Sequence, residues 1–328
     1  MFLFPSFKSL DLAVKIIIFG TLVASYDILL GYTGIISFGH AMFFGIGAYS
    51  MGFFLSKYGS PTYLNMVMAF MIAVMVAFLL ALVISFISLR VKAIFFAMVT
   101  LALAEFSMIL AMKLSRFSGG EDGISMSLPG ILTVSTDFGR FLGLDLTGRI
   151  MSYYFILLVC LGLFLVMLRF TESPLGRVLQ SIRDNVQRAE ALGYTTFVYQ
   201  TISITFGCIV ATIMGGLYAL WVGYVNPEST LHVTIVLDIL VMVIIGGMGT
   251  LYGGIIGAGF LQMAQTYLPD LQNLAKDLLP NATLLHTALE RWLLIFGILF
   301  ILVVFFFPRG VMGTIQEFTA RRKAAKAS

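Results

Sequence analysis

The stretch TESPLGRVLQSIRDNVQRAEALG, residues 171–193, is a polar segment that lies between two long apolar runs. Ser173 followed by Pro174 is typical of a helix start, because a Ser hydroxyl can accept a bond from an otherwise unpaired backbone N–H and Pro fits the first helical position. Gly193 suits a helix end. The segment between these signals predicts one helix, about 25 Å long at a rise of about 1.5 Å per residue.

Apolar side chains recur along this segment at spacings of three and four, which places them on one face of the helix: Leu175, Val178, Leu179, Ile182, Val186 and Ala189. The remaining surface is polar, with Arg183 and Asp184 in the middle of the predicted helix. The segment is too polar to cross a membrane, so we expect it at the membrane surface, within reach of a soluble partner. The alternative is an amphipathic connector among the lipid headgroups.

The composition of the 328-residue chain predicts an integral membrane protein. Hydrophobic residues make up 59% of the chain and charged residues 11%, whereas a soluble domain has about 25% charged residues. Long apolar runs exclude a β-barrel, whose strands would alternate in polarity. We therefore predict an all-α, multi-span helical bundle. Cys160 and Cys208 lie within apolar runs and show no metal or redox spacing.

Apolar runs long enough to cross a membrane fall at about 63–88, 93–112, 151–169, 201–222, 232–248, 250–267 and 291–307. With both termini and the 169–200 loop in the cytoplasm, that side holds thirteen of the 20 Lys and Arg residues and the other side seven, which agrees with the positive-inside rule. The N-terminus is then cytoplasmic only if residues 8–56 cross an odd number of times. Three short crossings there give ten in all; one long span plus a re-entrant segment is the alternative.

An internal similarity favours three crossings. Gly34, Gly45 and Gly47 precede Gly246, Gly257 and Gly259 by the same number of residues, and the second stretch reads as two short crossings that meet at 246–249. By analogy, the first stretch has two crossings that meet near Ser37–His40. Gly-interrupted apolar segments in corresponding halves indicate a translocation path, although chance matching between Gly-rich segments competes with this interpretation.

Several kinds of chemistry are missing from the sequence. No GxxxxGK[ST] motif occurs, so any ATP must be hydrolysed by another chain. His40, His232 and His286 show no metal-ligand spacing, no catalytic constellation is present, and the basic residues form no single patch for nucleic acid. We therefore expect neither an enzyme nor a bound cofactor or metal.

Few ionisable residues fall within the predicted spans: Asp27, Glu105, Asp238, and His40 if it lies at depth. Such residues are functional candidates because burying them is costly. Asp27 and Asp238 are also compatible with caps at the outer ends of their helices. Glu105 either lines a polar path or bonds a neighbouring helix. So few ionisable residues argue against an ion-coupled secondary transporter.

The coupling segment, residues 171–200, resembles the cytoplasmic segment of LivM-type permeases, which belong to bacterial ABC importers for branched-chain amino acids. The matching positions are Ser173, Pro174, Gly176, Arg177, Ile182, Arg183, Asp184, Asn185, Ala189, Glu190, Ala191, Leu192 and Gly193. The resemblance implies that this segment docks into a groove of an ATPase subunit.

Four other stretches carry the same resemblance. GIISFGHAMFFGIGAY at 34–49 is similar to an early family signature, and Gly119, Gly120, Asp122 and Gly123 are similar to an external TGGxDG motif in which Ser118 stands for Thr. GGMGTLYGG at 246–254 has Gly254 in place of the usual Pro, and FPRGVMG at 307–313 resembles the closing motif. A translocation path or close helix packing is expected at Gly34, Ser37, Gly39, His40, Gly45, Gly47, Glu105, Gly246, Gly247, Gly249 and Gly257.

The resemblance implies a transmembrane permease domain over residues 1–313, with an external loop at 113–150 and a basic cytoplasmic tail at 314–328. It also implies a second permease subunit in a heterodimer, two cytoplasmic ATPase subunits that bind the ATP, and a periplasmic or extracellular substrate-binding protein. The expected location is the bacterial inner membrane. The alternatives are a urea or short-amide permease of the same machinery and a stand-alone secondary transporter.

Overall fold

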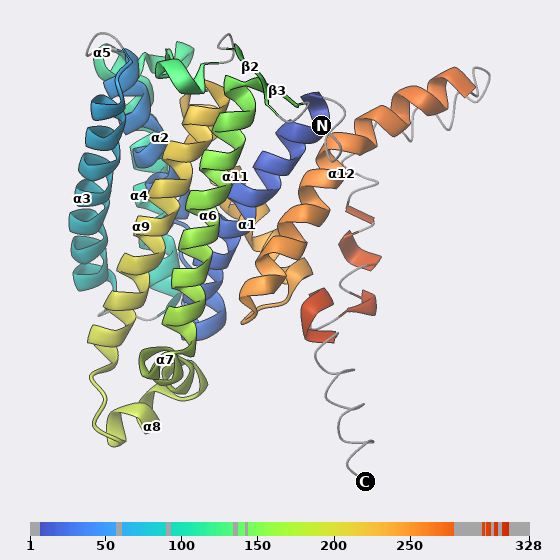
Figure 1. Cartoon of the computed structure of the whole chain (residues 1–328). Helices are drawn as coiled ribbons and strands as arrows, with labels where there is room; N and C mark the ends of the chain where they lie inside the picture. The colour runs from blue at the N-terminus through green and yellow to red at the C-terminus, as the bar shows by residue number, and fades with distance from the viewer. Residues whose placement is uncertain are drawn as a thin grey trace.

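The computed structural model describes residues 7–56, 61–89, 93–133, 137–141, 144–278, 297–298, 300–302, 305–307 and 310–314. Figure 1 shows a bundle of helices with short strands at one end. Within the described residues, six helical stretches are long and apolar enough to cross a membrane. The prediction of an all-α, multi-pass membrane protein is therefore confirmed.

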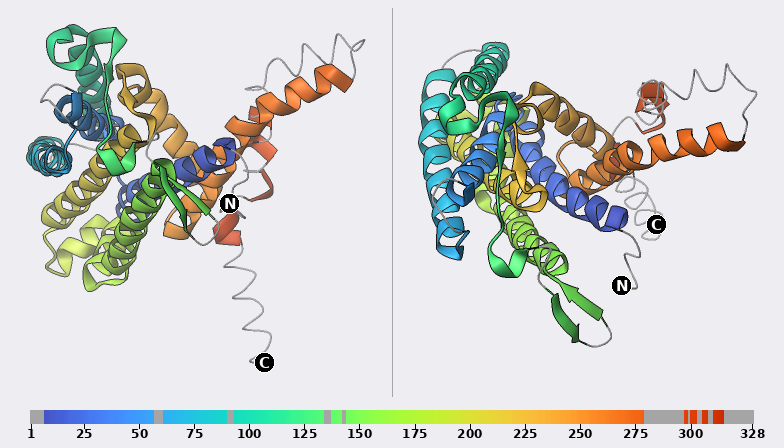
Figure 2. Two further views of the ribbon diagram at one scale, coloured as in Figure 1. Left: turned by 45° about the horizontal axis from the view of Figure 1, so that its top comes forward. Right: turned by 90° about the horizontal axis from the view of Figure 1, so that it is seen from above.

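The long helices follow one another through short connections. They are α1 (Phe7–Thr33), α2 (His40–Ser56), α3 (Tyr63–Ser88), α4 (Ala93–Lys113), α6 (Gly148–Glu172), α9 (Thr196–Val222), α11 (Val233–Gly246) and α12 (Leu251–Leu278). The four-residue α10 (Pro227–Thr230) precedes α11 in the sixth apolar stretch. Figure 2 shows the far end of α12 extending away from the bundle.

Short elements form one end of the bundle. They are α5 (Ser115–Ser118), the 3-10 turns η1 (Gly120–Asp122) and η2 (Gly130–Leu132), and strands β1 (Ile124–Ser125), β2 (Asp137–Phe141), β3 (Leu144–Thr147) and β4 (Tyr224–Val225). β1 pairs antiparallel with β4, and β2 pairs antiparallel with β3. The opposite end carries α7 (Pro174–Asp184) and α8 (Val186–Ala191), which lie below the long helices in Figure 1.

The centre of the bundle consists of α1, α2 and α9. Burial is strongest there, with Leu22, Tyr26 and Phe44 fully inside. In lipid, helices associate through close backbone approach rather than through burial from water. A Cβ added at Gly47 would lie 1.8 Å from the Thr212 carbonyl oxygen, and one at Gly215 would lie 1.8 Å from the Phe44 carbonyl oxygen. Glycines on α2 and α9 therefore bring these two helices together.

The two stretches that are similar in sequence have their helix connections where we predicted them, but their corresponding glycines do not make corresponding contacts. α1 and α2 meet through residues 34–39, and α11 and α12 meet through residues 247–250, as predicted. Gly257 packs against α11, where an added Cβ would lie 1.9 Å from the Met242 carbonyl oxygen. A Cβ added at Gly259 would meet nothing within 4 Å, so this glycine does not share the close contact of Gly47.

The three crossings predicted within residues 8–56 are wrong, because residues 7–56 hold two helices. Continuous α1 has 27 residues, about 40 Å at about 1.5 Å per residue, which is enough for one crossing. Its early charges do not interrupt it, since they are paired: Lys8 Nζ lies 2.5 Å from Asp270 Oδ2, and Lys15 Nζ lies 2.8 Å from Asp11 Oδ2. Two helices in place of three crossings lower the predicted count of ten crossings by one.

The N-terminal end of α1 also lies at the end of the bundle opposite α7, whereas Gly310 packs against Gly247 at the α7 end. The prediction that the N- and C-termini lie on the same side is therefore not confirmed. The charge count places Lys8 and Lys15 with the coupling segment, whereas the structure pairs Lys8 with the distant Asp270 and Lys15 with Asp11 on the same helix. The tail at 314–328 and most of the run at 291–307 lie outside the described residues.

Cysteine labelling tests this arrangement. Lys8→Cys and Glu121→Cys should react with an impermeant maleimide from the same side of the membrane, and Gln187→Cys from the other side. Lys8, Glu121 and Gln187 are exposed at opposite ends of the bundle, and the native Cys160 and Cys208 are buried and can be replaced by Ala. Labelling of Lys8→Cys together with Gln187→Cys would contradict the structure and restore an odd number of crossings before α3.

Candidate functional site

The coupling segment begins as predicted but is divided into two helices. Ser173 caps α7 by accepting a bond from the Gly176 backbone N–H at 3.4 Å, and Pro174 occupies the first turn. The predicted single helix breaks at Asn185, whose backbone is extended. The Asn185 side-chain oxygen accepts from the Arg188 N–H at 2.9 Å and so starts α8. Asn is a preferred cap residue, a signal that the continuing apolar spacing had obscured.

The inner face of α7 is packed against the membrane helices. Leu179 and Ile182 are fully buried, and a Cβ added at Gly176 would lie 2.0 Å from the Thr171 carbonyl oxygen. Ala189 of α8 is also buried. The outer face exposes polar side chains at Arg177, Gln180, Arg183, Asp184, Asn185, Gln187, Arg188 and Glu190. One face of the pair is thus fixed to the bundle, and the other is free for contact.

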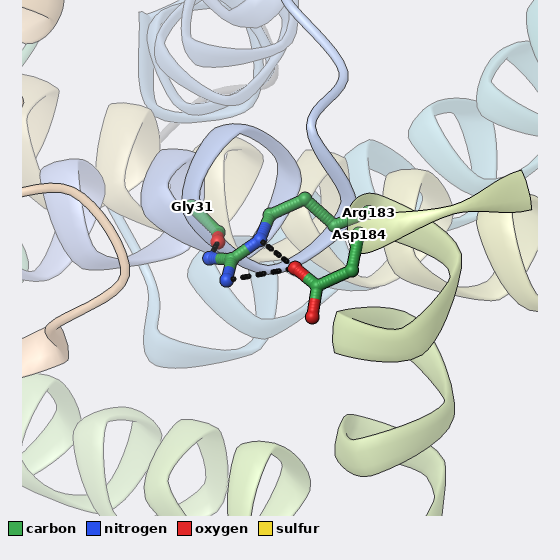
Figure 3. A network of polar contacts seen from close by, with 3 residues as sticks. All are labelled: Gly31, Arg183 and Asp184. Atoms are coloured by element: carbon green, nitrogen blue, oxygen red, sulfur yellow. Dashed lines mark hydrogen bonds and ion pairs between the residues drawn. The ribbon is translucent and has the colours of Figure 1, made fainter.

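Arg183 is exposed, as predicted, with a side chain that is 41% accessible, and it also reaches the end of α1. It does not lie in the middle of a helix, which corrects the prediction. It lies at the C-terminal end of α7, and its Nη1 donates to the Gly31 carbonyl oxygen of α1 (Figure 3). Its Nε and Nη2 lie 3.4 and 3.3 Å from Asp184 Oδ1. A Cβ added at Gly34 would lie 3.2 Å from Arg183 Cγ, and one at Gly249 would lie 3.4 Å from Arg183 Nη1.

Asp27 continues this connection from α1 to the α11–α12 turn. The residue is 1% exposed, and its Oδ1 accepts from the Gly249 backbone N–H at 2.8 Å. It therefore lies at the α7 end of the bundle, and the expected outer cap is wrong. Gly247 and Gly249 have φ values of 108° and 80°, a region that residues with a Cβ rarely adopt. The turn can therefore present its N–H to Asp27.

Four motifs that are far apart in the sequence thus meet at the α7 end: the end of α1 with Gly34, the end of α7, the Gly-rich turn at 247–250, and Gly310 beside Gly247. We refer to Asp27, Gly31, Arg183 and Gly249 as the coupling junction. The sequence points to Asp27, Arg183 and Gly249 for separate reasons. Gly31 was missed, because its contribution is a backbone carbonyl.

His40 and Ser37 belong to packing around the α1–α2 connection. His40 is fully buried, and the Tyr26 ring stands edge-on to it with ring centroids 4.9 Å apart. Ser37 Oγ accepts from the Gly39 N–H at 3.3 Å, and Thr100 Oγ1 of α4 accepts from the Phe38 N–H at 3.1 Å. These residues do not join the coupling junction.

The other two acidic candidates are also separate from the junction. Asp238 bonds a neighbouring helix, since Gln265 Nε2 of α12 donates to its Oδ2 at 3.4 Å, so the expected helix cap is wrong here too. Glu105 is half-buried on α4. Gly45 packs against Leu231, whose Cδ2 would lie 2.1 Å from an added Cβ.

The loop motif at 118–123 is a compact turn at the opposite end. Ser118 Oγ donates to the Ala111 carbonyl oxygen and accepts from the Gly120 N–H at 3.1 Å, a function for which Ser and Thr are equivalent. Gly119, Gly120 and Gly123 all have φ near 70°, and Tyr224 donates to the Asp122 carbonyl oxygen at 2.7 Å. The motif therefore builds the local backbone and links it to β4.

An apolar bundle with an anchored amphipathic helix pair at one end is the architecture of a multi-pass membrane protein. The chain belongs to the family described as "Branched-chain amino acid transport system / permease component", which it matches over residues 9–304. The family was predicted from the motifs, and the match confirms it.

Similar proteins carry the same description. The chain is 26% identical over 320 residues to the high-affinity branched-chain amino acid transport system permease protein LivM of Salmonella typhimurium, covering 93% of this chain and 70% of that protein. The LivM of Escherichia coli is also 26% identical, over 335 residues, with 97% and 73% covered. A probable LivM of Methanocaldococcus jannaschii is 24% identical over 228 residues, with 69% and 61% covered. No solved structure matches the chain.

Proposed function

We propose that this chain is one of two permease subunits of an ABC importer for branched-chain amino acids in the bacterial inner membrane. The observation that carries the proposal is the coupling junction beneath an exposed polar face. α7 offers Arg177 and Asp184 to a soluble partner, and Arg183 on the same helix bonds the end of α1. Movement of α7 by a partner would therefore act directly on a membrane helix.

The same arrangement supports the partners that we propose. The sequence has no P-loop, so two ATPase subunits would bind and hydrolyse the ATP at the α7 end. A second permease would cover part of the exposed apolar surface on α3, α4 and α6, which includes Met71, Phe106 and Leu158. A substrate-binding protein would dock at the opposite end, near the 118–123 turn. The names of the similar proteins support branched-chain amino acids as the substrate class.

Reconstitution tests this function. Vesicles that contain the chain with its partner permease and ATPases should accumulate leucine when ATP is inside and the binding protein and leucine are outside. Urea and acetamide should not be accumulated, because the expected substrates carry both an ammonium and a carboxylate. Leucine accumulation by the chain alone, without ATPases, would overturn the proposal in favour of a secondary transporter. Accumulation of urea or acetamide in place of leucine would overturn the substrate class.

A further inference from the structure

We propose that the flank of α4 that carries Glu105 is the contact face for the second permease subunit, whose facing helix supplies a hydrogen-bond donor to the Glu105 carboxylate. The inference rests on the proposed function, because it requires a second permease and assigns the face on which that subunit packs. It also gives a use to the one intramembrane acid of this chain that the coupling junction and the α11–α12 contact leave unexplained.

Glu105 lies deep within a membrane-spanning helix. α4 has 21 residues, about 31 Å at about 1.5 Å per residue, which matches a hydrocarbon core of about 30 Å. Glu105 is about 18 Å from the Ala93 end of the helix and about 12 Å from the Lys113 end. Its side chain is too short to reach either membrane surface. A carboxylate at this depth is costly unless it has a polar partner.

The described fold leaves Glu105 without such a partner. Within the part of the chain that the structure describes, no hydrogen bond or ion pair involves its side chain, whereas Asp27 bonds Gly249 and Asp238 bonds Gln265. Glu105 is half-buried, and α4 is the least buried of the six helical stretches that can cross a membrane. Glu105 is therefore open to a group from another molecule.

The two flanks of α4 differ in what they face. Phe96 and Thr100 are buried and belong to its inner side. Ser107 and Leu114 line a cavity that α4 shares with α2 and α3. At about 100° of rotation per residue, Glu105 lies on the opposite side of the helix from both Ser107 and Leu114. The Glu105 flank therefore faces away from this cavity.

The residues around Glu105 favour a dry contact with another helix over a water-filled path. Met98, Ala102 and Ile109 share its flank and are apolar and exposed, and Glu105 is the one charged residue in the sequence from 93 to 112. A water-filled path would need several polar groups along its length. Ala102 lies one turn from Glu105, and a small residue there lets another backbone approach closely. The partner that fits is an apolar transmembrane helix with one side chain that donates to Glu105, from Ser, Thr, Asn, Gln, Lys or Arg.

Site-specific photo-cross-linking tests the contact. Ile109→p-benzoylphenylalanine, co-expressed with the partner permease, should give a covalent product with that subunit on illumination. Leu110→p-benzoylphenylalanine is the matched control, because Leu110 is the next residue, is also exposed, and lines the cavity toward α2 and α3. The control should give no product with the partner permease. Cross-linking from Leu110 but not from Ile109 would overturn the proposal.

Substitution of Glu105 tests the hydrogen bond. Glu105→Leu should weaken co-purification of the partner permease by about threefold to tenfold, which is the scale of one hydrogen bond between membrane helices. Glu105→Gln keeps an acceptor oxygen and should retain more of the association than Glu105→Leu. The melting temperature of each variant chain without its partner serves as the folding control, and it should stay near the wild-type value, because no printed bond of the described chain is lost.

The remaining outcomes identify other occupants of the flank. Unchanged association of folded Glu105→Leu with the partner permease would overturn the proposal. Reaction of Glu105→Cys with an impermeant thiosulfonate in the assembled complex would place the flank in a water-filled path and overturn the helix contact. Cross-linking of the Ile109 variant to a second copy of this chain, or to lipid alone, would also overturn it. ATP-driven leucine uptake is measured separately, so an importer whose permeases pair through another face would leave the proposed function intact.

Discussion

Gly257→Ala should lower the melting temperature and the folded yield of the purified chain. The added Cβ would lie 1.9 Å from the Met242 carbonyl oxygen and 2.7 Å from its carbonyl carbon. Both atoms belong to the backbone of α11, so no side-chain rotation can relieve the overlap, and α11 and α12 must separate. Overpacking costs about 1–3 kcal/mol, and at about 2–4 °C per kcal/mol the upper value corresponds to a fall of about 6–12 °C.

Gly259→Ala is the matched control, because it makes the same change two residues later in the same helix. No atom lies within 4 Å of the position that its Cβ would take. Alanine is favoured over glycine in a helix by about 0.5–1 kcal/mol, so this variant should melt at the wild-type temperature or slightly above it. Equal melting of the two variants would show that the α11–α12 contact at Gly257 is not as close as the structure has it.

The contrast between these glycines shows the limit of the repeat seen in the sequence. The sequence pattern treats Gly257 and Gly259 alike, as it does Gly45 and Gly47. Which glycine faces a neighbour depends on the helix that packs there, and α2 packs on α9 whereas α12 packs on α11 and α1. The spacing predicts where two helices meet but not which of their faces touch.

The sequence predicts the local start of the helix in the coupling segment, but it does not predict which distant residues contact one another. Ser173 and Pro174 start α7 as predicted, because capping depends on residues within one turn. Asp27 bonds Gly249, 222 residues away, and Lys8 bonds Asp270, 262 residues away. Without those partners, the Lys and Arg count placed Lys8 on the side of the coupling segment, and the helix-cap interpretation placed Asp27 at the outer end of its helix. The motifs identify the family because each is a continuous stretch of sequence. The coupling junction joins residues from different motifs, so only the three-dimensional structure shows it.

The second prediction concerns the coupling junction. The variant Arg183→Glu should keep ATPase binding but lose the transmission of movement between the ATPases and α1. The variant should fold, because α7 is anchored by the buried Leu179 and Ile182 and Arg183 contributes one hydrogen bond to the Gly31 carbonyl. It should still bind the ATPases, since the variant keeps the other exposed polar residues of α7 and α8, among them Arg177, Asp184 and Arg188. A glutamate at this position cannot donate to the carbonyl and places a negative charge beside it. Substrate-stimulated ATP hydrolysis should therefore fall by about tenfold, within the range of about 1–3 kcal/mol typical of coupling between sites.

Arg177→Glu provides the comparison, because it reverses the same charge on the exposed face of the same helix. It should weaken ATPase binding, measured by co-purification, while each complex that does form keeps its stimulation by leucine and binding protein. Loss of ATPase binding in Arg183→Glu to the same extent as in Arg177→Glu would show that Arg183 contacts the ATPase directly. Full substrate stimulation of ATP hydrolysis in Arg183→Glu would show that the bond to Gly31 does not transmit movement between α7 and α1. The two residues lie six positions apart on one helix of 11 residues, and Arg183 bonds α1, so a difference between their defects would locate the transmitting contact at the junction with α1.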